Sequence, residues 1–404
     1  MLDLRSEAQA LMDQLVAWRR DLHRHPELAF EERRTAALVA EHLGRLGYEV
    51  QSGVGRTGVV GILEGDRAGK TVLLRFDMDA LPIEEANQVE YASEISGKMH
   101  ACGHDGHTAI GLGVATLLAR HRHRWAGRIK LVFQPAEETA GGARAMIADG
   151  VLEDPAPDIA LGLHLWNSLP VGRAIVQAGP FMAAATHFRL TIYGRGGHGA
   201  MPHETVDALV VAAHAIVALQ TIVSRNVNPT ETAVLSVGTF HAGRAFNVIA
   251  DRAELSGTIR AFEDRLMAQV QERLHQVVVG VSQAFGATFE LKLEHAAPTL
   301  ENDPTVASLV TNAACRVLGS GAVGPTTPVL VSEDMAEFLK RVPGCFFFLG
   351  SMNLERGLDY PHHHPRFDFD EAALPLGVAI LAEAAAAYLE EQGKGYDAAT
   401  SSHS

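Results

Sequence analysis

The residues of this chain with the clearest chemical potential lie in one short segment, His100-Ala-Cys-Gly-His-Asp-Gly-His107. Thiolate and imidazole groups bind divalent transition ions, and a nearby carboxylate can orient an imidazole ring. Cys102 and His104 stand two residues apart among glycines, where the backbone can turn sharply and present both side chains to one ion. The segment therefore predicts a metal-binding loop, and a buried cysteine beside structural histidines is the alternative. His107 is expected to open the next helix.

Two acidic pairs follow predicted strands. Asp77 and Asp79 come directly after the strand predicted over 71–76, and alternation places both carboxylates on the same side. Either could bind a metal or hold a ligand histidine by its second nitrogen. Glu137 and Glu138 follow a strand predicted over 129–133 and point in different directions, so one could bind metal while the other accepts a proton from metal-activated water. A solvated turn is the alternative for the aspartates, and a solvated helix end is the alternative for the glutamates.

Isolated histidines could complete the site. His164 lies in an apolar run, where a lone histidine is more often a core residue. The run His362-His363-His364 before Pro365 would in isolation be a surface turn. This supply of ligands fits two metals better than one. Mixed sulfur, nitrogen and oxygen ligands suit zinc, manganese, cobalt or nickel.

A glycine-rich segment, Gly194-Arg-Gly-Gly-His-Gly199, matches the pattern of dinucleotide-binding loops. A proline intervenes before the next helix, and no acidic residue stands near the expected ribose position, so this interpretation is disfavoured. His198 could instead hydrogen-bond a substrate carbonyl or its oxyanion. Asn247 and Arg260, in the same region, are possible carboxylate binders, although a strand-end amide and an exposed strand arginine are equally ordinary explanations.

The elements that must position these residues follow from apolar periodicity. Helical spacing predicts helices over 7–25, 31–46 and 108–120, in alternation with short β-type runs. Strands that alternate with helices predict an α/β fold in which helices sandwich a mixed, mostly parallel sheet. Ligands in such sheets bind at loops beyond the strand ends, which is where both acidic pairs fall.

From about residue 184 the pattern becomes strand–helix–strand–strand–helix–strand, which predicts a compact ferredoxin-like α+β unit. Helix resumes over 304–319 and 370–390, and buried strand resumes over 345–349, so we expect this unit to be inserted into the first domain. The predicted division is a catalytic domain over 1–183 and 296–404 and an inserted domain over 184–295.

Bulk composition narrows the function classes. The 404 residues, 47% hydrophobic and 20% charged, predict a soluble globular protein of two domains. The formal charge of -14 argues against nucleic acid or an anionic membrane as a partner. No run reaches the ~20 continuous apolar residues of a membrane span. Three cysteines without a disulfide pattern, and a start without a signal peptide, predict a cytoplasmic protein.

Taken in order, these landmarks resemble the dinuclear metallo-aminoacylase and carboxypeptidase family, in the branch of hippurate hydrolases, N-acyl-amino-acid amidohydrolases and indole-acetyl-amino-acid hydrolases. The motifs that carry the resemblance are Trp18-Arg-Arg-Asp-Leu-His-Arg-His-Pro-Glu-Leu28, Arg75-Phe-Asp-Met-Asp-Ala-Leu-Pro82, Met99-His-Ala-Cys-Gly-His-Asp-Gly-His107, Phe133-Gln-Pro-Ala-Glu-Glu138, Gly196-Gly-His-Gly-Ala-Met-Pro-His203, Ser332-Glu-Asp-Met335 and His363-His-Pro-Arg-Phe367. They span nearly the whole chain.

The resemblance implies a metallo-amidohydrolase that cleaves the amide bond of N-acyl amino acids. A dipeptidase, a carboxypeptidase or an N-acetyl-diaminopimelate deacetylase is the alternative within the family. A catalytically silent relative is disfavoured, because every implied site position is filled. The implied ligands of two divalent ions are Cys102, His104, Glu138, His164 and His363.

The other implied roles concern proton transfer and substrate binding. Glu137 would be the general base, and Asp79 would orient a ligand. His198 would reach a substrate across a dimer contact made by the inserted lid or dimerisation domain, so a homodimer or higher homo-oligomer is expected. Asn247 and Arg260 would hold the substrate carboxylate. Relatives place the last ligand two residues before the proline, which selects His363, and His362 remains possible.

Overall fold

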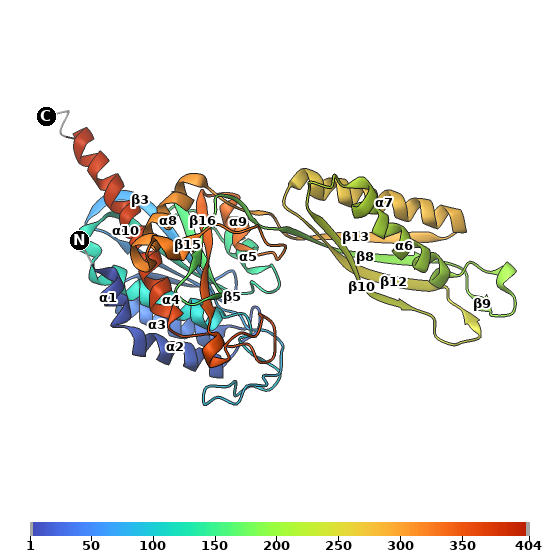
Figure 1. Cartoon of the computed structure of the whole chain (residues 1–404), viewed down its shortest axis with the longest axis horizontal. Helices are drawn as coiled ribbons and strands as arrows, with labels where there is room; N and C mark the ends of the chain where they lie inside the picture. The colour runs from blue at the N-terminus through green and yellow to red at the C-terminus, as the bar shows by residue number, and fades with distance from the viewer. Residues whose placement is uncertain (1–2, 401–404) are drawn as a thin grey trace. The chain divides into compact units, whose positions relative to one another are not determined.

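The computed structural model describes residues 3–400, and the side chains of residues 3–390. The chain divides into two compact units, which we call unit 1 and unit 2. Unit 1 comprises Met1–Phe181, Glu301–Thr327 and Asp334–Ser404, and unit 2 comprises Met182–Leu300 and Pro328–Glu333. The colours of Figure 1 show this insertion, because unit 1 is drawn from both ends of the bar and unit 2 from its middle.

Unit 1 is built on an eight-stranded sheet with the order β1-β2-β4-β3-β5-β16-β6-β15. The neighbours β4, β3, β5 and β16 are mutually parallel, whereas β1 and β2 add an antiparallel edge. The prediction of a mixed, mostly parallel sheet is therefore confirmed. The strands are β1 (Glu49–Val54), β2 (Gly58–Glu64), β3 (Arg67–Asp77), β4 (Ala126–Gln134), β5 (Ile159–Pro170), β6 (Ala174–Ile175), β15 (Val323–Gly324) and β16 (Gly344–Met352).

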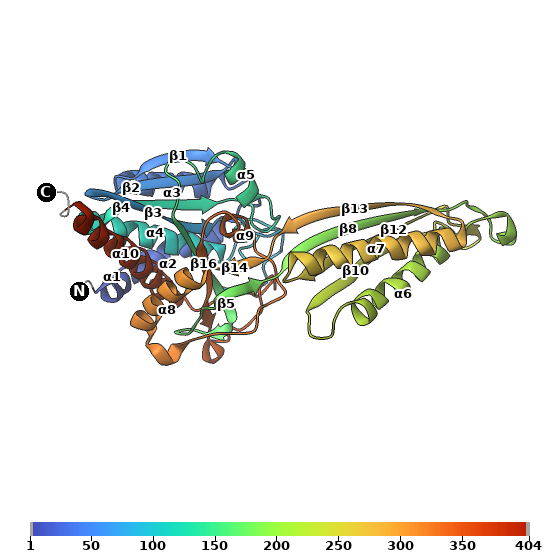
Figure 2. The same ribbon diagram turned by 90° about the horizontal axis from the view of Figure 1, so that it is seen from above.

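Helices cover both faces of this sheet (Figure 2). A Cβ on Gly162 of β5 would meet Met335 of α9, whereas Leu163, the next residue along that strand, lies against Gly377 of α10. Successive strand residues face opposite sides, so α9 and α10 occupy opposite layers. The helices of unit 1 are α1 (Leu4–Gln9), α2 (Met12–Arg24), α3 (Arg33–Arg45), α4 (His104–Arg120), α5 (Gly142–Ala148), α8 (Pro304–Leu318), α9 (Met335–Leu339) and α10 (Ala373–Thr400).

Helix α4 is the buried central helix of unit 1, and its start differs from the prediction. It begins at His104 and not at His107, because Gly103 takes a left-handed conformation with φ +92° and its carbonyl accepts the N–H of His107. Glycine also lets this helix approach its neighbours closely. A Cβ on Gly111 would lie 2.6 Å from the Phe133 ring and 2.7 Å from the Phe76 ring.

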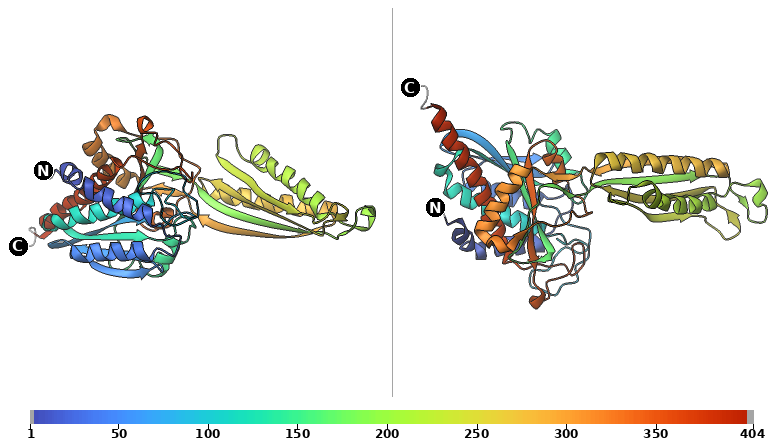
Figure 3. Two further views of the ribbon diagram at one scale, coloured as in Figure 1. Left: turned by 90° about the horizontal axis from the view of Figure 1, so that it is seen from below. Right: turned by 45° about the horizontal axis from the view of Figure 1, so that its top comes forward.

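Unit 2 is a four-stranded antiparallel sheet with the order β10-β12-β8-β13, and two helices pack on one face (Figure 3). The elements run strand–helix–strand–strand–helix–strand, as predicted for a ferredoxin-like unit. They are β8 (Ala184–Tyr193), α6 (Ala208–Asn226), β10 (Ala233–Ala242), β12 (Arg252–Ala261), α7 (Asp264–Phe285) and β13 (Thr288–Ala297). The short pairs β9 (Gly197–His198) with β11 (Val248–Ile249) and β7 (Gly179–Met182) with β14 (Leu300–Asn302) complete the described strands.

One segment falls outside the predicted division. Pro328–Glu333 groups with unit 2, although the sequence placed it in the catalytic domain over 296–404. The reason is main-chain pairing: the N–H of Ala183 donates to the carbonyls of Val329 at 3.1 Å and Val331 at 3.0 Å. A segment distant in sequence is thereby attached to the residue just before β8, the first long strand of unit 2.

Among the described residues, two helices are long and apolar enough to cross a membrane by composition alone, Ala208–Asn226 and Ala373–Glu390. The second is 72% buried and is a core helix of unit 1. The first is 33% buried, and its Val211, Ala215 and Leu219 belong to the core of unit 2. Such helices are weak evidence for a membrane span.

Candidate metal centre

The candidate site lies where parallel strands of unit 1 end. Asp77 is the last residue of β3 and is paired with Gln134, the last residue of β4. Carboxyl ends of parallel strands meet at one edge of the sheet, so the residues that follow them converge there. The adjacent strand β5 supplies His164, and the first turn of α4 supplies His104. The fold thus gathers residues that are far apart in sequence.

The predicted ligands come together in unit 1. Within each of three overlapping groups, the potential ligand atoms all lie within 4.8 Å of one another. These groups are Cys102 with His104 and His164, Cys102 with Glu138 and His363, and His104 with Glu137 and Glu138. Because the groups share members, they form one continuous cluster, which we call the metal cluster. Its size and mixed donors suit more than one divalent ion.

His104 provides the test of whether a cation fits here. Its Nδ1 donates to the main-chain carbonyl of Asp79 at 2.9 Å, which leaves Nε2 to face the cluster. Nε2 is buried, has no hydrogen-bond partner and lies 4.0 Å from carboxylate oxygens of both Glu137 and Glu138. A buried polar atom without a partner is costly, and a bound cation would satisfy it. The residues present therefore fit a metal site.

His164 and Cys102 face each other across the cluster. The Nδ1 of His164 donates to the carbonyl of Leu165 at 2.7 Å, and its Nε2 lies 3.5 Å from the Cys102 sulfur. Burial, followed by the neighbouring His107 and His362, lowers the pKa of His164 well below its usual range, which keeps the ring neutral as a ligand requires. Burial and then Glu138 and Glu137 raise the pKa of Cys102. A cation must therefore replace its proton to form the thiolate.

The histidine run separates into two environments. His362 donates from Nε2 to the Leu165 carbonyl at 2.9 Å, and burial lowers its pKa to about 4. His363 instead has a left-handed backbone with φ +65°, and its Nε2 lies 3.3 Å from Oε1 of Glu138. The geometry thus favours His363 over His362 as the ligand, and its role remains a proposal.

Asp79 organises the cluster differently from the expectation. Its carboxylate accepts the main-chain N–H groups of Glu137 and Glu138, each at 3.0 Å. It orients His104 mainly through its carbonyl, because its Oδ1 lies farther from Nδ1, at 3.3 Å. One residue thus fixes the backbone of the acidic pair and the ring of a histidine.

Sequence reasoning missed a second layer of buried partners. The N–H of Leu165 donates to Nε2 of His107 at 2.9 Å, so the ring proton sits on Nδ1 and is donated to Asp77 at 2.6 Å. His107 is therefore a support of Asp77 and not the helix start that was predicted. Arg75 donates to Asp77 at 2.7 Å and to Asp334 at 2.9 Å. Arg75 and Asp77 are two residues apart on β3, so their side chains point to the same side of the sheet, and this spacing could have suggested the pair.

The electrostatics of the metal cluster favour cations. The carboxylates of Asp77, Asp79 and Glu138 raise the pKa of His104 to about 10, although burial, the largest single effect, opposes this shift. A proton held that strongly indicates a concentrated negative potential. A divalent cation would neutralise that potential in place of the proton.

Unit 2 holds the three residues predicted to bind substrate. His198 is exposed in β9, where it pairs with Val248, and the Asn247 carbonyl accepts the N–H of Gly199 at 2.8 Å. The backbone thus brings His198 and Asn247 together. Arg260 is partly buried in β12 and donates to its neighbour Ile259 at 3.4 Å. Among residues 3–390, no carboxylate lies within ion-pair distance of Arg260.

The glycine-rich segment of unit 2 is explained by close backbone packing. A Cβ would lie 2.1 Å from the Val206 carbonyl at Gly194 and 2.9 Å from the Asn247 carbonyl at Gly199. The following helix α6 is capped by Asp207, whose carboxylate accepts the N–H of Leu209 at 2.9 Å. A carboxylate at that helix end occupies the position where a dinucleotide site would bind phosphate. The geometry thus disfavours a dinucleotide site.

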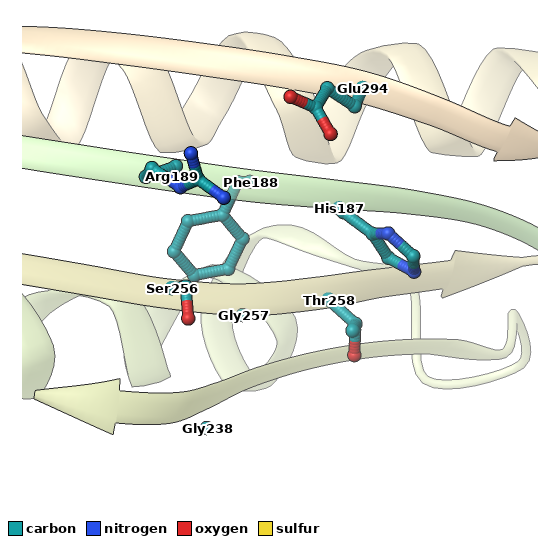
Figure 4. A pocket seen from close by; sticks show the side chains of 8 residues that line it. All are labelled: His187, Phe188, Arg189, Gly238, Ser256, Gly257, Thr258 and Glu294. Carbon is teal, nitrogen blue, oxygen red and sulfur yellow. The ribbon is translucent and has the colours of Figure 1, made fainter. Parts of the chain in front are cut away.

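Unit 2 also has a pocket of about 340 Å³ on the open face of its sheet (Figure 4). Its lining residues come from all four strands: His187, Phe188, Arg189, Gly238, Ser256, Gly257, Thr258 and Glu294. His198, Asn247 and Arg260 are not among them. The pocket is therefore distinct from the residues that the sequence singled out.

Known proteins resemble this chain over nearly its full length. The model of peptidase family M20/M25/M40 matches residues 73–387. A thermostable carboxypeptidase 2 of Saccharolobus solfataricus is 41% identical, covering 94% of this chain and 97% of that protein. An N-acetyl-L-cysteine deacetylase of Bacillus subtilis is 40% identical, covering 94% and 89%. A solved Bacillus subtilis structure, described as a dinuclear metal binding peptidase from the M20 family, superposes with a TM-score of 0.82 at 34% identity, covering 95% and 99%.

Proposed function

This chain belongs to peptidase family M20/M25/M40, and we propose that it hydrolyses the amide bond of N-acyl amino acids to a carboxylic acid and an amino acid. It is a hydrolase whose relatives include a deacetylase and a carboxypeptidase. The observation that carries the proposal is the metal cluster, in which five potential ligands come together and one of them, His104, has a buried Nε2 without a hydrogen-bond partner. A site of this composition suits hydrolysis by activated water.

The proposed ligands of two divalent ions are Cys102, His104, Glu138, His164 and His363. When bound, such ions acidify water and polarise an amide carbonyl. Asp79 keeps the acidic pair and His104 oriented through the hydrogen bonds described above. Histidine ligands that are oriented by a hydrogen bond at the second nitrogen are typical of catalytic metal sites.

The proposed chemistry of the protein groups follows from their positions. Glu137 accepts a proton from the attacking water, whose oxygen bonds to the acyl carbon. The carbon–nitrogen bond then breaks, and Glu137 returns the proton to the leaving amine. His198 donates to the oxyanion across the proposed dimer contact, and Asn247 with Arg260 binds the substrate carboxylate. No carboxylate among the side chains of residues 3–390 pairs with the Arg260 guanidinium, which supports this role.

We further propose zinc, manganese, cobalt or nickel as the ions, a homodimer or higher homo-oligomer as the assembly, and the cytoplasm as the location. Sulfur, nitrogen and oxygen donors together support these metals. The three cysteines, Cys102, Cys315 and Cys345, are unpaired, which supports a reducing compartment. We propose no nucleic-acid or membrane partner, because the net charge of -14 is unfavourable for either.

The test is hydrolysis of N-acetyl, N-benzoyl and N-indoleacetyl amino acids, with dipeptides in parallel, by protein stripped with a chelator and reloaded with each metal. We expect activity to disappear on stripping and to return with metal. Cys102→Ala should lower metal content measured by elemental analysis. Preferential cleavage of dipeptides would support the peptidase alternative, and activity without metal would contradict the proposal.

A further inference from the structure

We propose that Glu32 is a positioning residue for catalysis, because it holds the turn that presents Glu137 to the reaction. The inference rests on the proposed role of Glu137 as general base. Glu32 is fully buried immediately before α3, more than 100 residues from the acidic pair in sequence, and it is not among the predicted site residues. Buried carboxylates normally require strong partners, so its contacts indicate what it does.

The Glu32 carboxylate binds the backbone of the turn directly. Its Oε1 accepts the N–H of Ala136 at 2.9 Å and the N–H of Phe30 at 3.0 Å. Its Oε2 accepts the hydroxyl of Thr57 at 2.5 Å. Glu32 thus links its own segment and the β1–β2 connection to the residue that precedes Glu137.

Ala136 needs this anchor because its backbone is left-handed, with φ +53°. Residues other than glycine rarely adopt this conformation, and it persists where surrounding contacts enforce it. The carbonyl of Ala136 accepts the N–H groups of Gly141 at 3.3 Å and Gly142 at 3.1 Å. Its N–H is held by Glu32, so both peptide groups that flank the strained residue are fixed.

The turn that follows is closely packed against its own start. A Cβ on Gly142 would lie 1.6 Å from the carbonyl oxygen of Pro135. Three consecutive N–H groups are bound by two buried carboxylates: Glu32 takes that of Ala136, and Asp79 takes those of Glu137 and Glu138. A buried carboxylate therefore binds the backbone of Ala136, just as another binds the backbone of Glu137 and Glu138.

The two carboxylates differ in what else they contact. Asp79 also holds a proposed ligand, His104, so its loss would disturb both the metal and the base. The hydrogen bonds of Glu32 go to Phe30, Thr57 and Ala136, none of which is a proposed metal ligand. Loss of Glu32 should therefore misplace Glu137 while the metal stays bound.

The experiment compares Glu32→Ala, Glu32→Asp and Glu32→Gln, with Thr57→Val as the matched control. Alanine removes the acceptor and aspartate is one methylene too short, so kcat should fall about 10- to 100-fold, as expected when a catalytic group is misplaced. Glutamine keeps an oxygen for both N–H groups and should retain activity within about threefold. Thr57→Val removes the hydroxyl contact alone and should behave like the unmodified protein.

Two further measurements separate positioning from general damage. Metal content should be unchanged, and KM should stay within about threefold. Hydrogen–deuterium exchange of the peptide covering 135–142 should become faster in Glu32→Ala but not in Thr57→Val, with and without metal. Glu32→Asp provides the same comparison if the alanine variant does not fold.

A rescue variant tests the mechanism itself. Glycine tolerates the left-handed conformation, so Ala136→Gly in the Glu32→Asp background should raise kcat about fivefold. Absence of rescue, a loss no larger than in Thr57→Val, or a loss that parallels loss of metal would overturn the inference. If Glu137→Gln itself remains active, the proposed base is wrong, and that outcome is distinguishable because it does not involve Glu32.

Discussion

The two units place their candidate functional residues in opposite surroundings. In unit 1, Asp79, His107 and His164 are buried, and each is oriented by hydrogen bonds of known direction. In unit 2, His198 is exposed on a two-residue strand, and no carboxylate of the described side chains pairs with Arg260. The metal cluster is therefore preorganised within one unit, whereas the proposed substrate groups are exposed or only partly buried.

This difference suits the tasks proposed for each unit. Water activation depends on fixed distances between donor atoms, so rigid support raises efficiency. The proposed binding of varied acyl amino acids would tolerate side chains that can adjust to each substrate. Four measurements test whether the two units differ in this way.

The largest effect is expected for Glu137→Gln. Glutamine has nearly the same shape but accepts no proton from water, so kcat should fall about 10²- to 10⁴-fold. Metal content should remain unchanged, because Glu137 is not a proposed ligand. Steady-state kinetics with elemental analysis checks both, and near-normal turnover would refute the assignment of the base.

Removal of metal should destabilise unit 1 selectively. Bound ligand at about 100 times its Kd stabilises a protein by about 2.7 kcal/mol. Trp18, Trp125 and Trp166 all belong to unit 1, so denaturant unfolding followed by tryptophan fluorescence reports on that unit. Hydrogen exchange of unit 2 peptides provides the control. Equal destabilisation of both units would show that they do not behave separately.

Arg260→Ala should weaken capture of substrates that carry a free carboxylate. Loss of a charged hydrogen bond corresponds to about a 10- to 100-fold rise in KM. Substrates whose carboxylate is amidated lack this interaction and should change little. An equal effect on acid and amide substrates would show that Arg260 acts in some other way.

The smallest effect is expected at two helix caps. Asp303 caps α8 of unit 1 through the N–H groups of Thr305 and Val306, and Asp207 caps α6 of unit 2. Alanine at either position should cost about 1 kcal/mol of helix stability. Only Asp303→Ala should shift the tryptophan transition, with Asp303→Asn as the control that keeps the cap. A shift from Asp207→Ala would indicate one cooperative unfolding unit.

Sequence patterns predicted which residue types bind metal and that they lie at the ends of the strands. They did not predict the buried residues that hydrogen-bond to these ligands and orient them. Cys102, His104 and Glu138 lie in short motifs next to predicted strands, so the sequence alone predicts them as metal ligands. Glu32 bonds to Ala136 across 104 residues, a separation that no local pattern reveals. The left-handed alanine was also unpredictable, because alanine does not favour that conformation.

The segment Pro328–Glu333 was equally hidden, because main-chain hydrogen bonds, which leave no pattern in the sequence, pair it with unit 2. Its last residue is followed by Asp334, which belongs to unit 1 and accepts hydrogen bonds from Arg75 and Gln134. The chain therefore passes between the units four times instead of the two passes of a simple insertion. The last of these passes, from Glu333 to Asp334, leads directly into the buried residues that support Asp77.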